Sequence, residues 1–358
     1  MITAAARTRA AALRARFAAA GAQVVEPPIL QDAGLLLDLY GEDMRARAYV
    51  TSDAVRGERM LRPDFTVPVV QMHMEAGGSP ARYTYAGEVF RRQDADPDRA
   101  SEYLQVGFEL MGGRDPGADD AEVFALMFAA TEGLGLRAVT GDIGILLAAV
   151  DGLRTTAARR AALRRHIWRP ARFRALLDVL AGRVPGPPAR AALLAGDVPA
   201  AGPEIGLRSA GDVADRIAAL REDEAAGPLA EDDVAGIAAL LDVAGAMPAA
   251  LSQLRDLARD LPAIQSAVEG LERRAEALAA RGIDVTALAF EARYGRTSME
   301  YYDGFVFGLT APGRPDLPPV ASGGRYDALT ARLGGGTAIP AVGAVLRPGL
   351  MTELEAEA

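Results

Sequence analysis

The chain has 358 residues, half of them hydrophobic, and a formal net charge of −9; it is long enough for one large or two modest domains, and its acidity argues against a general nucleic-acid binder. There is no cysteine, and the two histidines, His73 and His166, lie far apart, so disulfides and thiolate sites are excluded and neither a histidine metal cluster nor a Ser-His-Asp triad is expected. No apolar run approaches the roughly 20 residues of a membrane span and no signal peptide precedes the first helix, so a soluble, cytoplasmic protein is expected.

The first 150 residues alternate between helical and strand-like patterns. A helix is predicted over 4–20, because Leu13 and Phe17 share one face, and Pro27-Pro28 then starts an extended segment. Further elements are expected in chain order: a helix or turn at 29–39, strands at 46–52 and 59–62, a helix at 67–75, strands at 81–91 and 103–111, a helix at 119–133 and a strand at 138–144. The strands at 81–91 and 103–111 are most simply an antiparallel hairpin with a long loop.

Residues 151–280 have a different texture, in which Ala, Leu and Arg recur at helical spacing between Pro and Gly interruptions. Strand character returns afterwards at 284–292, 303–310, 318–322 and 341–346, with a helix near 325–333. Early and late strands separated by a helical block predict an α+β fold. The expected organisation is a core of an antiparallel sheet flanked by helices, made by 1–150 and 281–358, with a helical insertion at 151–280.

Several short segments fall in an order that resembles the catalytic core of histidyl-tRNA synthetases, which are class II aminoacyl-tRNA synthetases. The matching segments are Leu61–Thr66 (LRPDFT), Glu88–Arg92 (EVFRR), Gln105–Glu109 (QVGFE), Met299–Phe307 (MEYYDGFVF), Gly323–Asp327 (GGRYD) and Pro340–Gly343 (PAVG). Each segment alone is a weak signal, but their shared order and spacing are not expected by chance. The resemblance covers 1–145 and 280–347 and does not extend well into the helical middle.

The resemblance implies a pocket for histidine, and the residue types suit that ligand. Carboxylates, an amide and a hydroxyl can accept from ammonium and imidazole donors, an arginine can hold an anionic oxygen, and tyrosines can wall a small ring. The implied histidine-binding residues are Asp64, Thr66, Arg91, Gln105, Glu109, Tyr302 and Tyr326. Purely structural roles remain open: Glu109 could alternate outward on a strand, and Asp64 could cap the helix that follows it.

Adenylation needs cations to hold the triphosphate and offset its developing charge. Three departures from the family pattern fall on residues that are expected to contact the nucleotide. Thr297 stands where the family has an arginine, although a slip of one residue would recover Arg296. Gln93 replaces a glutamate that reads adenine, and Leu350 replaces an arginine that contacts ATP. Pro348, nearby, disfavours the continuation of a helix at that point. Adenylation is therefore expected to be lost, and no catalytic residue, cofactor or metal is predicted.

The chain also ends at Ala358, before any anticodon-binding domain, so tRNA selection is not expected. The resemblance is then to truncated relatives that regulate ATP phosphoribosyltransferase in histidine biosynthesis. It implies a class II homodimer joined to a short-form catalytic ATP phosphoribosyltransferase subunit in a hetero-octamer, with histidine as the feedback ligand. Two alternatives stay open: an amino-acid-activating enzyme of the histidyl-tRNA synthetase type without an anticodon-binding domain, and a free-standing RNA binder.

The stretch 154–174 is not explained by the resemblance. It contains eight arginines together with His166 and Trp168, a density typical of nucleic-acid contacts. Because the chain has no lysine, the same pattern also fits an ordinary surface helix, and it could equally meet an acidic partner.

Overall fold

The computed structural model describes residues 2–34, 46–77, 79–93, 99–196, 208–297 and 300–357. Its main feature is a nine-stranded sheet in the order β1-β5-β6-β12-β11-β10-β7-β9-β8. Neighbouring strands are antiparallel except in the pairs β1·β5 and β7·β9. The strands are β1 (Gln23–Val24), β5 (Ala81–Phe90), β6 (Glu102–Met111), β7 (Arg137–Asp142), β8 (Ala244–Ala246), β9 (Ala289–Glu291), β10 (Phe305–Thr310), β11 (Ala321–Arg325) and β12 (Ala341–Leu346). The predicted α+β class is confirmed.

The predicted hairpin is present, with β5 and β6 paired from Ala81↔Met111 to Phe90↔Glu102. On its other edge β6 pairs with β12, so that Glu109 lies opposite Gly343. The centre of the sheet thus joins two parts of the chain that are more than 200 residues apart. The late strands differ from expectation at their ends: β9 is confined to Ala289–Glu291, and β11 begins after Pro318 and Pro319, which have no N–H to give to a ladder.

One face of the sheet is covered by helices α1 (Ala4–Ala19), α4 (Pro116–Ala130) and α14 (Pro348–Glu357). Phe17 of α1 meets Phe108 of β6 edge-on at 5.8 Å between ring centroids, and Phe124 of α4 meets Phe307 of β10 at 5.0 Å. Pro348 does not interrupt a helix, because β12 ends at Leu346 and a new helix begins after it. Pro348 is the first residue of α14, a position where its missing N–H costs no intrahelical bond.

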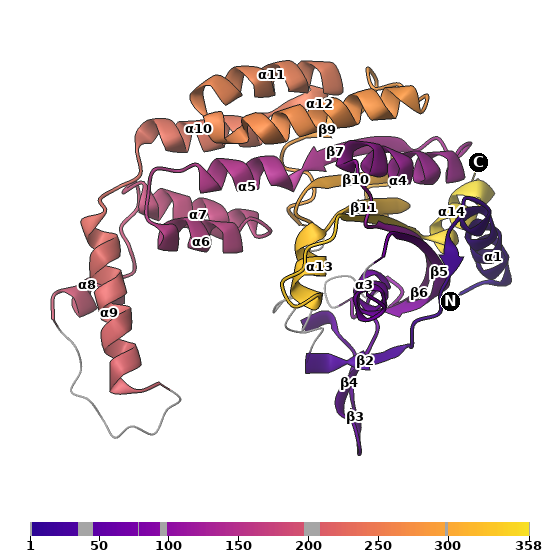
Figure 1. Cartoon of the computed structure of the whole chain (residues 1–358), viewed down its shortest axis with the longest axis horizontal. Helices are drawn as coiled ribbons and strands as arrows, with labels where there is room; N and C mark the ends of the chain where they lie inside the picture. The colour runs from indigo at the N-terminus through magenta and orange to yellow at the C-terminus, as the bar shows by residue number, and fades with distance from the viewer. Residues whose placement is uncertain are drawn as a thin grey trace.

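The other face carries α3 (Thr66–Glu75) and α13 (Asp327–Leu333), with a small sheet of β2 (Leu30–Asp32), β4 (Gly57–Leu61) and β3 (Val50–Asp53) beyond them. In Figure 1, α3 lies inside the curve of β5 and β6, whereas α1 and α14 lie outside it. Successive side chains of β6 point to opposite faces of the sheet, so Phe108 faces α1 and Glu109 faces α3. The inner face is therefore where the predicted site residues can meet.

Between 151 and 280 the described chain is almost entirely helical, and Figure 1 shows α8 and α9 reaching away from the sheet. The helices near and within this stretch are α5 (Ile143–Asp151), α6 (Ala157–Arg165), α7 (Pro170–Leu180), α8 (Pro188–Leu194), α9 (Ala210–Ala225), α10 (Glu231–Asp242), α11 (Met247–Asp260), the 3₁₀ turn η1 (Pro262–Ile264) and α12 (Gln265–Ala280). None of the helices in the described ranges has the length and apolar character that a bilayer crossing requires. The division of the chain at 150 and 281 stays a prediction.

A buried cluster of charges joins α12 to α4 and the sheet. Asp120 of α4 is fully buried and accepts from Arg274 of α12 at 2.8 Å and from Arg325 of β11 at 2.7 Å. Arg274 also pairs with Asp142 at 2.9 Å, and its guanidinium lies over the ring of Phe305. Arg325 precedes Tyr326 in the Gly-Gly-Arg-Tyr-Asp motif, so this part of the motif serves packing.

Candidate functional site

Glu109 is the centre of a buried hydrogen-bond network on the inner face of the sheet. Its side chain has no exposed surface. Oε1 accepts from the Thr66 hydroxyl at 2.9 Å and the Tyr85 hydroxyl at 2.7 Å, and Oε2 accepts from the Tyr326 hydroxyl at 2.5 Å. Burial raises the pKa of Glu109 to about 7, although the three hydroxyls oppose that rise. The interpretation of Glu109 as an outward strand residue is therefore wrong.

Two glycines make room for this network. A Cβ at Gly343, opposite Glu109 on β12, would lie 1.4 Å from Glu109 Oε2, and a Cβ at Gly107 would lie 2.2 Å from the Tyr85 ring. The carboxylate and the ring thus occupy space that any other residue's side chain would fill. The glycines in the motifs QVGFE and PAVG are therefore required by packing, which cannot be seen from the motifs alone.

Replacing Gly343 by alanine is expected to displace the Glu109 carboxylate and to lower the unfolding free energy by about 1–3 kcal/mol, the usual cost of overpacking a core. Thermal or denaturant unfolding measures this loss. Gly349→Ala is the matched control, because a Cβ there meets nothing within 4 Å and alanine favours the helix it occupies. Equal stability of Gly343→Ala and the wild type would show that the network can shift aside.

Asp64 and the tyrosine pair adjoin this centre. The Tyr301 hydroxyl donates to Asp64 Oδ2 at 3.3 Å, and the Tyr301 ring lies 4.9 Å from that of Tyr302 and 6.0 Å from that of Tyr326. The backbone N–H of Val67 reaches Asp64 Oδ1 only at 3.5 Å, the limit of a hydrogen bond. Asp64 is thus a weak cap of α3 and at the same time part of the polar cluster.

Arg91 and Gln105 border the cluster on the hairpin. Arg91 donates from Nε to the Pro63 carbonyl at 2.7 Å, and its charge lowers the pKa of Tyr302, which burial otherwise raises. Gln105 is 1% exposed, and its Oε1 has no hydrogen-bond partner within the described part of the chain. It lies on the same strand face as Glu109, four residues earlier and about 13 Å along the strand. A buried free acceptor suits an N–H donor of a ligand.

The structure therefore links Thr66, Glu109 and Tyr326 by direct bonds, places Asp64, Arg91 and Tyr302 beside them, and sets Gln105 further along the strand. Tyr85 and Tyr301 were not among the predicted residues, yet Tyr85 donates to the Glu109 carboxylate and Tyr301 donates to the Asp64 carboxylate. Phe65, also not predicted, stacks on Tyr85 at 4.3 Å. Tyr85 could have been found from the alternation of side chains in the hairpin, because it lies opposite Gly107 on the sheet face that carries Glu109. That inference requires the register of the two strands, which a long connecting loop leaves open.

The positions that depart from the family pattern hold other contacts. Arg296 does not replace the missing arginine at Thr297 within this network: its Nε donates to the Ile167 carbonyl at 2.9 Å and its guanidinium lies 4.9 Å from the Phe173 ring centre. Thr297 is exposed, whereas Gln93 and Leu350 are half-buried. In the described ranges, no group of three or more His, Asp or Glu residues is arranged to hold a metal ion.

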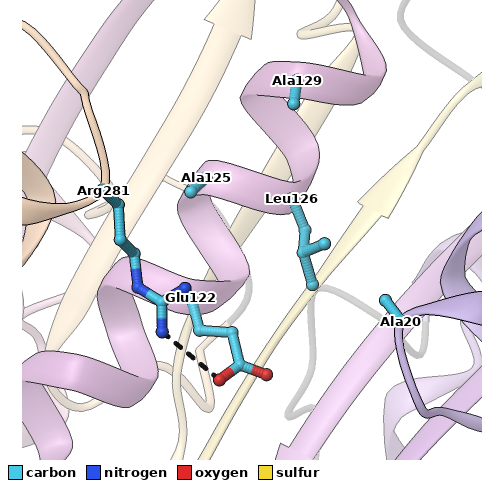
Figure 2. A pocket seen from close by; sticks show the side chains of 6 residues that line it. All are labelled: Ala20, Glu122, Ala125, Leu126, Ala129 and Arg281. Carbon is cyan, nitrogen blue, oxygen red and sulfur yellow. Dashed lines mark hydrogen bonds and ion pairs between the residues drawn. The ribbon is translucent and has the colours of Figure 1, made fainter.

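A shallow cavity lies elsewhere, at the ends of α1 and α12 along α4. Figure 2 shows its lining: Ala20, Glu122, Ala125, Leu126, Ala129 and Arg281, with Arg281 paired to Glu122. None of the seven predicted site residues takes part in it. Apart from the one ion pair its lining is apolar, so it offers little to an amino acid.

Comparisons with known proteins show the family and the fold of the chain. The sequence model of the family described as histidyl-tRNA synthetase matches residues 2–349. The chain is 33% identical over 352 residues to an ATP phosphoribosyltransferase regulatory subunit of Mesorhizobium japonicum, covering 91% of this chain and 92% of that protein. It is 32% identical over 353 residues to one of Brucella anthropi, covering 92% and 93%.

Solved structures share the fold. A histidine–tRNA ligase subunit from Alicyclobacillus acidocaldarius superimposes with a TM-score of 0.60 at 25% identity, covering 98% of this chain and 94% of that one. A protein from Bacillus halodurans, described as an ATP phosphoribosyltransferase regulatory subunit/histidyl-tRNA synthetase, gives a TM-score of 0.69 at 21% identity, covering 98% and 78%.

Proposed function

The chain belongs to the histidyl-tRNA synthetase family, and within it to the ATP phosphoribosyltransferase regulatory subunits; from this membership we propose that it binds histidine and transmits feedback inhibition to a short-form catalytic ATP phosphoribosyltransferase, which it also activates. In this proposal it forms a class II homodimer that joins the catalytic subunits in a hetero-octamer, and it carries out no adenylation of its own.

The observation that carries the proposal is the buried polar cluster on the inner face of the sheet. Asp64 and Glu109 offer carboxylates to an ammonium or imidazole donor, and Arg91 offers a guanidinium to a carboxylate. The unpartnered Oε1 of Gln105 adds a neutral acceptor at the far end. A zwitterion with a heteroaromatic ring matches this set of two carboxyl groups, one guanidinium, one amide and flat tyrosine walls.

The second candidate is an amino-acid-activating enzyme, which family membership alone leaves open. Its supporting observation is the same cluster, because activation also begins with amino-acid binding. Thr297, Gln93 and Leu350 weigh against it, since each replaces a residue type that would contact nucleotide, and Arg296 is engaged by Ile167 and Phe173. Histidine-dependent exchange of pyrophosphate into ATP separates the two candidates, because only the enzyme catalyses it.

Histidine is expected to inhibit the assembled phosphoribosyltransferase through this chain, and Gln105→Leu is expected to weaken that response. Removing one acceptor from a buried donor costs about 1–3 kcal/mol, or roughly 5- to 150-fold in affinity. A coupling of about 1–3 kcal/mol between sites predicts graded rather than absolute inhibition. Calorimetry on this chain gives the histidine affinity, and an activity titration of the complex gives the inhibition.

Gln265→Leu is the control for this experiment, because Gln265 is exposed on α12 and its side chain bonds only Glu269 among the described residues. It should leave both the affinity and the inhibition unchanged. If the Gln105→Leu complex assembles and stays as sensitive to histidine as the wild type, the sensor lies elsewhere. Pyrophosphate exchange above the blank would instead establish the enzyme.

A further inference from the structure

Arg296 is a buried cation that has no counter-charge among the described residues. Its side chain is 4% exposed, and its Nε is held by the Ile167 carbonyl. Its Nη2 is buried without a hydrogen-bond partner, and no carboxylate of the described residues forms an ion pair with it. Burial lowers the pKa of Arg296 to about 10, and the nearby Arg293 and Arg174 contribute to the same direction. An unpaired buried charge is strongly unfavourable, so proteins normally pair such groups.

The arginines of the stretch 154–174 divide into two groups. Towards the start of the stretch, Arg154, Arg159 and Arg164 pair with Asp233, Asp223 and Asp151. Towards the end, Arg169 pairs with Glu300. The exposed Arg165, Arg172 and Arg174, however, have no ion pair with any described carboxylate. Arg160 of α6 also forms no ion pair with a described carboxylate and donates to the Leu153 and Thr155 carbonyls. The other three arginines without an ion pair lie around the α6–α7 turn that Arg296 contacts, so positive charge is in excess there.

The same turn presents two more buried nitrogens that have no hydrogen-bond partner in the described ranges. These are Nδ1 of His166 and Nε1 of Trp168, the two residues that flank Ile167. The indole nitrogen is a donor only, the imidazole nitrogen can donate, and a guanidinium has no acceptor. Within the described residues, the turn and Arg296 therefore combine N–H groups that lack acceptors with an excess of cations. That is the complement of an oxyanion, whose oxygens accept only.

We propose that Arg296 and the 166–169 turn between α6 and α7 bind a small phosphoryl anion at a site separate from the Glu109 cluster. The burial of Arg296 selects for a small anion, since the phosphates of a folded nucleic acid or the carboxylates of a partner surface do not reach a group 4% exposed. The bound anion supplies the missing counter-charge, bridging α7 to the segment that leads into Tyr301 and Tyr302. Exposed Arg172 and Arg174 guide it inward.

The test uses inorganic phosphate as the probe on the full chain, by calorimetry and by thermal unfolding at constant ionic strength with chloride as the balancing salt. The wild type is expected to bind phosphate saturably and to unfold at higher temperature in its presence. Arg296→Met is expected to weaken phosphate binding at least tenfold and to abolish the thermal shift. Without phosphate this variant should be no less stable than the wild type, because it removes an unpaired charge.

Arg255→Met is the matched control, since Arg255 lies in the same helical region, has a side chain that is 57% exposed, and pairs with Glu272 alone among the described carboxylates. This variant should bind phosphate like the wild type. Trp168→Phe keeps an aromatic ring but removes one N–H, and it should weaken phosphate binding without loss of folding. Unchanged phosphate affinity in Arg296→Met, or no saturable binding by the wild type, overturns the proposal. Binding of single-stranded RNA that phosphate does not displace, and that Arg172→Gln or Arg174→Gln removes, would identify a nucleic-acid surface instead.

Discussion

Replacing Asp120 by alanine is expected to lower the unfolding free energy by about 3–5 kcal/mol, the cost of breaking a buried ion pair by removing one partner. Asp120 has no exposed surface and accepts from both Arg274 and Arg325. Its removal leaves two guanidinium groups in the core with Asp142 and Asp327 as their remaining carboxylates. Denaturant unfolding monitored by circular dichroism measures the loss.

Two controls make the Asp120 result specific to the buried network. Glu272→Ala removes a carboxylate from the exposed pair with Arg255 and should leave the transition midpoint nearly unchanged, as exposed ion pairs contribute little. Asp120→Asn keeps the shape and one acceptor, so it should fall between the wild type and alanine. A loss in Asp120→Ala no larger than that of Glu272→Ala would mean that Arg274 and Arg325 find solvent or new partners. The result bears on architecture as well, because Arg274 is the buried link from α12 to the sheet.

The second large effect is a dependence of stability on pH that comes from Glu109. Burial raises its pKa from 4.5 to about 7 in the folded chain. Between these pH values the folded state holds a proton that the unfolded state has released. Unfolding therefore releases a proton, and a rise in pH favours unfolding. The stabilising contribution is complete below pH 4.5 and is lost as pH rises through 7. A shift of this size corresponds to about 3 kcal/mol.

Glu109→Gln is expected to remove this dependence, because an amide does not titrate in this range while its oxygen can still accept from Thr66 and Tyr85. The measurement is the unfolding free energy of both proteins in steps from pH 4.5 to 8. The unfolding free energy of the variant should increase relative to that of the wild type as pH rises, by about 3 kcal/mol over the whole range. Parallel curves would show that Glu109 ionises at its ordinary pKa and that the enclosed carboxylate is better solvated than its burial indicates.

The sequence by itself determined the family and most of the local elements. The helix or turn predicted at 29–39 was wrong at Leu30–Asp32, which form β2, and residues 35–39 lie outside the described ranges. Periodicity predicted α1, α3, α4 and both strands of the β5–β6 hairpin to within a few residues, because alternation and helical spacing are written into consecutive residues. The order of short motifs indicated the histidyl-tRNA synthetase fold, since such motifs keep their place even when nucleotide contacts change. Boundaries were less accurate. The strand predicted at 318–322 is β11 at Ala321–Arg325, because Pro318 and Pro319 have no N–H to give to a ladder.

The tertiary structure decided which side chains meet. Glu109 lies inside because β12 pairs with the far edge of β6 and presents Gly343 to it, and a register shift of one residue would turn the carboxylate to the opposite face. Tyr85 reaches the same carboxylate because the β5–β6 register sets it opposite Gly107, and Tyr301 reaches Asp64 from the segment before β10. Arg296 lies one residue from a position expected to contact nucleotide, but its side chain packs on α7 instead. Contacts between residues so far apart in sequence depend on strand order and helix docking, which no local pattern encodes.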